Sequence, residues 1–270
     1  MPSFSLAALT VLELAPPALI DVAAACGYQQ VGIRLLPAAP GGLAYPLMDD
    51  KAALRETLIR LDATGITVAD LEVVAIRPET EIAAFSAFFE AGARLGARHI
   101  LVAAYDPDLN RFKDRYAAFC DAAAPHGLTA DLEFMPWTYV PDLVTARSIV
   151  AQIDRPNAGI LVDALHFDRS RSSFDELARI PAAWLHYWQI CDGPAERPAT
   201  TEEMIHAARY ERMFPGEGGI DLVSLKRAMP TDITVSVEVP TAELAKTVDA
   251  KARAQRALDA ARRVIARAEA

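Results

Sequence analysis

The sequence predicts an α/β protein folded as a single (β/α)8 barrel that spans residues 1–270. Segments typical of strands and of helices alternate along the whole chain, with no break in composition between them. The strand segments are short, nearly continuous apolar runs, as expected for parallel strands that are buried on both faces. Four of these runs, successive along the chain, carry an oxygen-bearing side chain at or near their C-terminal ends. The C-terminal strand ends of such a barrel are where active sites assemble.

Eight segments are predicted to be strands because they are short, apolar and rich in β-branched residues. They cover residues 3–9, 30–34, 66–76, 97–104, 128–134, 158–165, 182–190 and 232–239. An open, doubly wound sheet is the alternative architecture. Such a sheet would carry a glycine-rich first turn for a nucleotide, but the stretch AALTVLELAPP after the first strand contains no glycine. The barrel is therefore favoured.

The segments between the strands are predicted to be helices because apolar residues recur at spacings of three and four. Glycines just past the helix ends support this interpretation, at Gly27, Gly65, Gly96 and Gly127. The expected helices cover residues 16–27, 50–65, 79–96, 108–127, 140–153, 173–180 and 221–228, with a terminal helix from about Thr241. An insert between Gln189 and Phe214 either covers the strand ends or presents a solvated face.

Composition excludes several classes of protein. The longest apolar stretches are shorter than the ~18 residues that a membrane span needs, and the N-terminus lacks the basic region of a signal peptide, so we interpret it as the first strand. The net charge is −9, and the chain has no Lys/Arg block that could track phosphates, which disfavours nucleic acid as a partner. Three cysteines without metal or disulfide spacing indicate a reducing, cytoplasmic location.

The four strand-end residues are predicted to bind a metal ion. They are Glu133, Asp163, Gln189 and Glu238. Three carboxylates that converge at one end of a barrel repel one another strongly unless a cation lies between them. An all-oxygen set suits a hard divalent cation, so Mn²⁺ or Mg²⁺ is expected in preference to Zn²⁺, with Co²⁺ as an alternative.

Strand parity supports this set. Side chains alternate between the two faces of a strand, so Glu133 shares its face with Asp131 and Thr129. A polar row near a strand end fits a site better than a sealed core. On the strand of Gln189, the same alternation predicts that Tyr187 faces the barrel interior, and that His186, Trp188 and Ile190 face the helices.

These residues resemble those of the xylose isomerase-like TIM-barrel superfamily, which includes sugar isomerases, ketose 3-epimerases, inosose dehydratases and dehydroshikimate dehydratases. The likeness covers nearly the whole chain. Its most specific parts are the metal set, the motif Asp163-Ala164-Leu165-His166 and the loop FPGEGGIDL at 214–222. Ketose epimerases commonly have His as the third ligand, where this chain has Gln189. A Gln at this position is similar to bacterial dehydroshikimate dehydratases, which also have a comparable R-x-F-P-G-x-G loop, here beginning at Arg212.

The resemblance implies a metal-dependent isomerase or epimerase acting on a small sugar, polyol or hydroxy-keto acid. Glu133 and Glu238 would exchange protons on opposite faces of the substrate beside a carbonyl, through a metal-stabilised enediolate. The alternative is a lyase of the dehydroshikimate dehydratase type, with His166 as the base. His166 follows Asp163 by three residues, where a group with a pKa near 6.5 suits proton transfer. The likeness also implies a homodimer or homotetramer.

Further residues are candidates for substrate binding. Arg34, Arg77 and Arg212 could each grip a carboxylate or phosphate; Arg77 and Arg212 match positions that bind substrate in the dehydratases. Trp137 is expected to line the pocket. Glu217, within the glycine-rich loop, is expected to approach the substrate as the glycines let the backbone turn tightly. Asp70 and Glu72 share the inward face of the third strand and could support the site.

The residues disfavour two other functions. An endonuclease of the same barrel class acts on abasic DNA with a cluster of zinc ions and many histidines, whereas this chain has five histidines and an acidic charge. A binding module without catalysis is opposed by the complete set of metal ligands. Neither is favoured.

Overall fold

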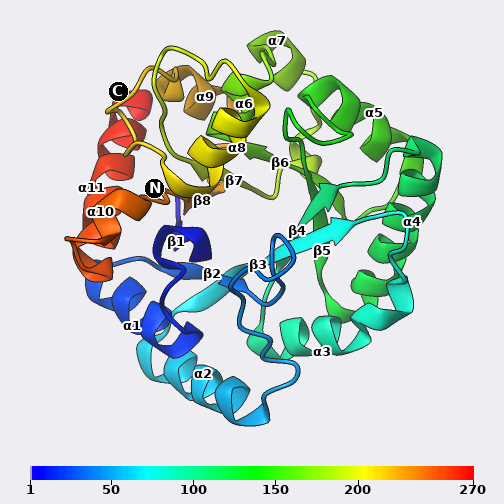
Figure 1. Ribbon diagram of the computed structural model, residues 1–270, viewed down its shortest axis with the longest axis horizontal. Helices are drawn as coiled ribbons and strands as arrows, with labels where there is room; N and C mark the ends of the chain where they lie inside the picture. Colours follow the sequence, from blue (N-terminus) through cyan, green and yellow to red (C-terminus); the bar gives the residue numbers. More distant parts are fainter. Residues whose placement is uncertain (1) are drawn as a thin grey trace.

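The protein is a closed barrel of eight parallel strands in residues 2–270, which are the residues that the computed structural model describes (Figure 1). Each strand pairs with the next in sequence, and β8 closes the barrel on β1. The strands are β1 Phe4–Leu6, β2 Gln30–Arg34, β3 Thr67–Ile76, β4 His99–Ala104, β5 Thr129–Glu133, β6 Ala158–Asp163, β7 Tyr187–Ile190 and β8 Thr234–Val237. The predicted fold class is confirmed.

Helices surround the barrel and follow the predicted order (Figure 1). Aspartates begin several of them, since the side chains of Asp50 and Asp108 accept hydrogen bonds from the first free backbone N–H groups. The α-helices are α1 Pro16–Cys26, α2 Lys51–Thr64, α3 Ser86–Leu95, α4 Leu109–Ala123, α5 Leu143–Ile153, α6 Ala164–Arg169, α7 Phe174–Leu177, α8 Thr201–Tyr210, α9 Leu222–Ala228, α10 Ala242–Ala245 and α11 Ala250–Glu269. Short 3-10 helices lie at η1 Ala8–Val11, η2 Ile82–Phe85, η3 Ala124–His126 and η4 Ala182–Trp184.

Several boundaries differ from the predicted ones; for example, the strand predicted at residues 182–190 is only β7 Tyr187–Ile190, because η4 occupies Ala182–Trp184. The first strand is only three residues long, because the chain turns into η1 directly after it. The terminal helix expected from Thr241 is two helices, α10 and α11, and the side chain of Asp249 caps the second one. Helix α6 was not predicted: it begins directly after β6, with Asp163 as its N-cap, so His166 lies inside a helix.

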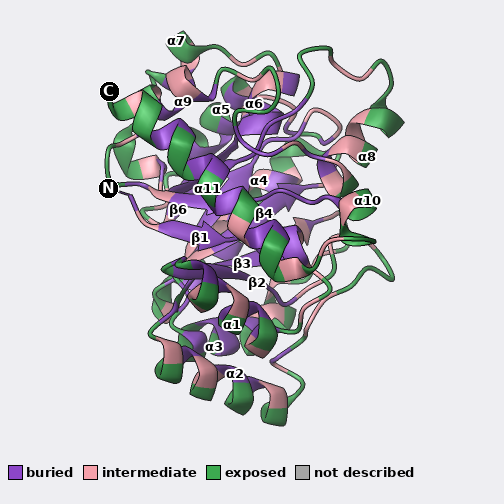
Figure 2. Ribbon diagram, turned by 90° about the vertical axis from the view of Figure 1, so that its left-hand side faces the viewer, coloured by how far each residue is buried: buried purple, intermediate pink, exposed green. Residues whose placement is uncertain are grey.

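The apolar core has two parts. The larger part lies between the strands and the surrounding helices, and includes Phe88, Phe119 and Trp188. Inside the barrel, Leu101, Leu161 and Tyr187 form a small separate cluster. Figure 2 shows the strands buried at the centre, with exposed residues on the outer faces of helices such as α2 and α11. The barrel interior therefore contains side chains of its own.

A search of the described residues for a helix both long and apolar enough to cross a membrane found none.

Candidate active site

The four predicted metal ligands lie at the C-terminal ends of four consecutive strands. Glu133 is the last residue of β5, and Asp163 is the last residue of β6. Gln189 pairs with Asp163 across β6 and β7, and Glu238 directly follows β8. All four are buried: the exposed fraction is 5% for Glu133, 3% for Glu238 and 0% for the other two. The fold thus gathers these side chains at one end of the barrel.

A cavity of about 300 Å³ opens at the same end. Glu133, His166, Arg212 and Glu238 lie in its wall, whereas Asp163 and Gln189 are outside that wall in the structure of residues 2–270. The apolar part of the wall includes Leu9, Leu12, Leu43, Val73, Ala75, Leu101, Ala103, Met135 and Trp137. A cavity of this size and mixed lining is suited to a small molecule.

The guanidinium of Arg212 lies among the carboxylates and balances part of their charge. Its Nη1 is 2.6 Å from Oδ2 of Asp163, and its Nη2 is 2.9 Å from Oε2 of Glu238. Nη1 also donates to Sγ of Cys191, at 3.3 Å. Arg212 was predicted to bind substrate. In the structure its guanidinium forms ion pairs with two of the predicted metal ligands, Asp163 and Glu238.

Other oxygens of the site remain free. The amide nitrogen of Gln189 donates to Oε1 of Glu238 at 3.0 Å, which leaves the buried Oε1 of Gln189 without a hydrogen-bond partner among the described residues. The nearest ionisable partner of Glu133 is His166, whose Nε2 is 3.7 Å from Oε1 of Glu133. Buried polar groups are normally paired, so these free oxygens indicate a missing ligand.

The carboxylates differ in how readily they hold a proton. Burial, and next the charges of Asp163 and Glu238, raise the pKa of Glu133 well above its usual range. Burial also raises the pKa of Glu238 to about 7, although Arg212 opposes this shift. Burial acts in the same direction on Asp163, but Arg212 and His166 outweigh it and the pKa of Asp163 is lowered. The three acids therefore differ in protonation near neutral pH, which proton transfer requires.

His166 lies in the cavity wall between the carboxylates and an aromatic ring. Its backbone N–H donates to Oδ1 of Asp163 at 3.0 Å, and its ring meets Trp137 edge-on with centroids 5.0 Å apart. Burial lowers the pKa of His166 to about 4, so the imidazole is neutral at pH 7 and can accept a proton. Trp137 lines the cavity, where it was expected.

On the far side of the cavity, Arg34 is held by a carboxylate of β3. Its Nη2 and Nε lie 2.5 and 3.1 Å from Oε2 of Glu72. Arg34 still lines the cavity, so its remaining N–H groups can meet a substrate. Asp70, two residues before Glu72, is fully buried, and neither of its oxygens has a partner in the described part of the chain. Burial, then Glu72, raises the pKa of Asp70 well above its usual range.

Two candidate residues do not reach the cavity wall. The guanidinium carbon of Arg77 lies over the ring of Tyr105, 4.7 Å from its centroid. Of these two residues, Tyr105 lines the cavity and Arg77 does not. Glu217 lies away from the cavity, contrary to the expected substrate contact, because its carboxylate pairs with Arg256 of α11 at 2.9 Å. The loop that contains Glu217 is held by Asp192, whose buried carboxylate accepts hydrogen bonds from the backbone N–H groups of Gly216 and Ile220.

The insert between β7 and β8 covers part of the cavity. Its helix α8 ends at Tyr210, and Ala208, Arg209 and Tyr210 contribute to the wall. A Thr200 capping box begins this helix. The sequence left open whether the insert covers the site, since its amphipathic pattern does not say which face meets the barrel.

The donors present can hold a metal ion. The ligand atoms of Glu133, Asp163 and His166 lie within 4.8 Å of one another, and the free amide oxygen of Gln189 is buried at the end of the neighbouring strand. Arg212 stands where positive charge is needed, since it bridges Asp163 and Glu238. A cation that bound all four predicted ligands would share these two carboxylates with the guanidinium.

Comparison with known proteins gives a family match. The model of a family described as "Xylose isomerase-like TIM barrel" matches residues 20–266. Curated relatives include the inosose isomerases of Bacillus licheniformis, 31% identical over 105 residues, and of Bacillus subtilis, 31% identical over 127 residues. These matches cover 38% and 44% of this chain, and 35% and 42% of the relatives. The 3-dehydroshikimate dehydratase of Pseudomonas aeruginosa is 26% identical over 110 residues, 40% of this chain and 17% of that protein. The matched region is thus less than half of each relative.

Solved structures share the fold over nearly the whole chain. The IOLI protein with a binding zinc atom has a TM-score of 0.80 at 22% identity, with 98% of both chains covered. The D-allulose 3-epimerase of Methylomonas sp., in complex with D-allulose, has a TM-score of 0.70 at 17% identity, over 97% of this chain and 96% of that chain. At these identities, the likeness shows the fold.

Proposed function

This chain belongs to the xylose isomerase-like TIM barrel family, and from that premise we propose that it is a divalent-metal-dependent isomerase or epimerase. Its substrate would be a small polyhydroxylated carbonyl compound, such as a ketose or an inosose. The curated inosose isomerases support this class of substrate. The cavity of about 300 Å³ is compatible with a molecule of that size.

One observation carries the proposal: two buried carboxylates, Glu133 of β5 and Glu238 beside β8, line the same cavity from different strand ends. An isomerase or epimerase needs one group to remove a proton beside a carbonyl and another to return it. Because burial raises the pKa of Glu238 to about 7, this carboxylate can gain and lose a proton near neutral pH.

In the proposed reaction, Glu238 takes the proton from the carbon beside the substrate carbonyl. The electron pair of the broken C–H bond forms the enediolate, and Glu133, once it has taken up a proton from solvent, returns that proton to carbon from the other side; its raised pKa favours this uptake. A divalent cation held by Glu133, Asp163, Gln189 and Glu238 would stabilise the negative charge on the substrate oxygens. Arg34 and Arg212 would bind and orient the substrate oxygens, and Trp137 would exclude water from one side.

A dehydratase is the second candidate, and His166 supports it. This neutral, buried imidazole lines the cavity beside Glu133, where it could remove a proton next to a carbonyl. The adjacent C–O bond would then break, and the leaving hydroxide would depart as water with the proton of Glu133. The matched region of the Pseudomonas aeruginosa 3-dehydroshikimate dehydratase is consistent with this reaction.

Hydrogen exchange with solvent tests the proposal. The purified protein is incubated with Mn²⁺ and an inosose or ketose in D2O, and deuterium at the carbon beside the carbonyl is followed by NMR. Exchange together with a new isomer is expected, and both should be lost in Glu238→Gln. If these substrates neither exchange nor isomerise, while dehydroshikimate yields an aromatic product absorbing in the ultraviolet, the protein is a dehydratase and the isomerase proposal is wrong.

A further inference from the structure

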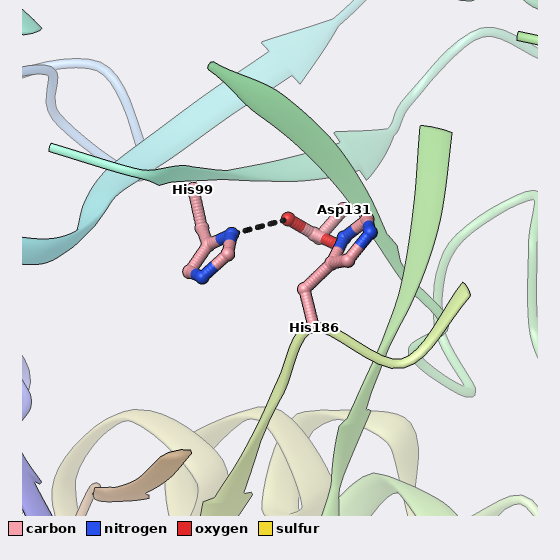
Figure 3. A group of neighbouring side chains, drawn as sticks. All are labelled: His99, Asp131 and His186. Carbon is pink, nitrogen blue, oxygen red and sulfur yellow. Dashed lines mark hydrogen bonds and ion pairs between the residues drawn. The ribbon is translucent and has the colours of Figure 1, made fainter. Parts of the chain in front are cut away.

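A second cluster of ligand-type side chains lies away from the cavity, toward the N-terminal ends of the strands (Figure 3). His99 is the first residue of β4, Asp131 is the third residue of β5, and His186 immediately precedes β7. Figure 3 shows the two imidazole rings on either side of the Asp131 carboxylate. None of the three residues lies in the wall of the cavity described above, within residues 2–270.

The three side chains converge closely. Nδ1 of His186 is 2.6 Å from Oδ1 of Asp131, and Nδ1 of His99 is 3.8 Å from Oδ2 of the same carboxylate. One ligand atom from each residue lies within 4.8 Å of the other two. The two rings are also nearly parallel, with an interplanar angle of 5° and centroids 5.5 Å apart.

This arrangement corrects the parity expectation for His186, which was predicted to face the helices. The residue precedes the regular part of β7, so alternation along the strand does not fix its direction. Room for its ring comes from Gly159 of β6, which pairs with Asp131 in the sheet. A Cβ atom at Gly159 would lie 2.2 Å from Oδ1 of Asp131 and 2.6 Å from Nδ1 of His186. No residue other than glycine could occupy this position without moving the cluster.

The carboxylate of Asp131 requires a positive partner. It is fully buried, and within the described chain no Arg or Lys lies within ion-pair distance of it; its ion-pair partners are the two histidines. A buried carboxylate without a counter-charge is costly. Burial lowers the pKa of His186, but its hydrogen bond to Asp131, together with the charge of that carboxylate, outweighs burial and the pKa is raised, so a proton on this ring can supply the charge. A cation bound by all three side chains can supply it in place of that proton.

We propose that His99, Asp131 and His186 form a second metal site, which binds a first-row transition-metal ion such as Zn²⁺. Two imidazole nitrogens and one carboxylate oxygen are ligands that Zn²⁺ prefers, at distances of about 2.0–2.2 Å. In a tetrahedral site, such ligands lie about 3.4 Å apart. The 3.8 Å separation already approaches that spacing, and the 2.6 Å contact would open by less than about 1 Å on binding.

Neighbouring groups would orient these ligands. The hydroxyl of Thr129 donates to Oδ2 of Asp131 at 2.7 Å, and the His186 ring also hydrogen-bonds the backbone of Ala183. Hydrogen bonds of this kind orient histidine and carboxylate ligands in metal sites. The side chains of His99 and His186 are 14% and 17% exposed, so an ion can enter and solvent can supply a fourth ligand.

Such an ion would connect β4, β5 and the segment before β7 at the N-terminal end of the barrel. Residues at this end of a barrel contribute to stability rather than to catalysis. The site therefore does not depend on the proposed reaction, and its ligands differ in kind from the oxygen donors at the opposite end.

Zinc binding to variants tests the proposal. Protein stripped by a chelator is titrated with Zn²⁺ in excess Mg²⁺, against a colorimetric zinc indicator. We expect His99→Asn and His186→Asn each to weaken one zinc-binding step by at least about tenfold. His126→Asn serves as the matched control, since it removes a histidine at the C-terminal end of η3. Glu133→Gln is a second control, since it alters the other end of the barrel. Both controls should keep the zinc-binding step that the two histidine variants weaken. Equal zinc affinity and stoichiometry in all five proteins would overturn the proposal.

A second measurement does not depend on the folding of variants. Crystals of the unaltered protein are soaked in Zn²⁺, and the anomalous signal at the zinc edge is mapped. A peak between His99, Asp131 and His186 is expected. A peak confined to the Glu133 and Asp163 end, or no peak at all, would contradict the second site.

Discussion

Replacing Arg212 by Met removes the positive charge that the carboxylates of the candidate active site share. The guanidinium is 6% exposed and pairs at 2.6 Å with Asp163 and at 2.9 Å with Glu238. Removing one partner of a buried ion pair typically costs about 3–5 kcal/mol, because it leaves an uncompensated charge. Glu238 already has a pKa of about 7 and can take up a proton, so we expect a loss near 3 kcal/mol in the free energy of unfolding at pH 7.

A divalent cation should reverse part of this loss. Without the guanidinium, Asp163 and Glu238 attract a cation more strongly, so Mn²⁺ should bind Arg212→Met more tightly than the unaltered protein. A ligand present at 100 times its dissociation constant adds about 2.7 kcal/mol to the stability of the state that binds it. Saturating Mn²⁺ should therefore stabilise the variant more than the unaltered protein.

Urea unfolding with and without Mn²⁺ measures both effects. Arg209→Met is the matched control, because Arg209 also lines the cavity but forms no ion pair within residues 2–270. Its free energy of unfolding should change by less than about 0.5 kcal/mol. The reasoning is refuted if Arg212→Met is as stable as the unaltered protein, or if Mn²⁺ stabilises both proteins equally.

Three further outcomes are expected. Gln189→His should shift metal preference from Mn²⁺ toward Zn²⁺, because imidazole nitrogen is the softer donor; an unchanged preference in competition binding would place Gln189 outside the ligand set. Glu238→Gln should lower kcat by about 10²–10⁴-fold at unchanged secondary structure, and turnover close to that of the unaltered enzyme would remove Glu238 from proton transfer. Burial raises the pKa of both Cys120 and Cys191 to about 12, so at pH 8 only about one thiol in ten thousand is ionised; fast labelling of either residue by a thiol reagent in the folded protein would contradict this.

The sequence was sufficient for the barrel because each strand is a short apolar run and each helix has regular apolar spacing. Glycines in the left-handed conformation at Gly27, Gly65 and Gly96 end helices where they were predicted. Glu133 and Asp163 were predicted at or near strand ends because each follows an apolar run, and they are the last residues of β5 and β6.

Other features depend on contacts between distant segments, which spacing along the chain does not encode. Arg212 and Asp163 are 49 residues apart, and their contact depends on how the insert after β7 folds back. His186 turns toward Asp131 because Gly159, on a third segment, leaves space for its ring. Glu217 was misplaced because Arg256 of α11 draws its carboxylate to the surface.

Strand β5 carries one member of each group of ligand-type side chains. Asp131 and Glu133 point to the same side of the strand and are two residues apart, about 7 Å along it. Between the two groups, the interior of the barrel contains Leu101, Leu161 and Tyr187, which are nearly or fully buried. The nitrogen-containing set lies toward one end of the barrel and the oxygen-rich set lies at the other. The two ends of the barrel can therefore select different cations, with donor chemistry deciding the metal at each end.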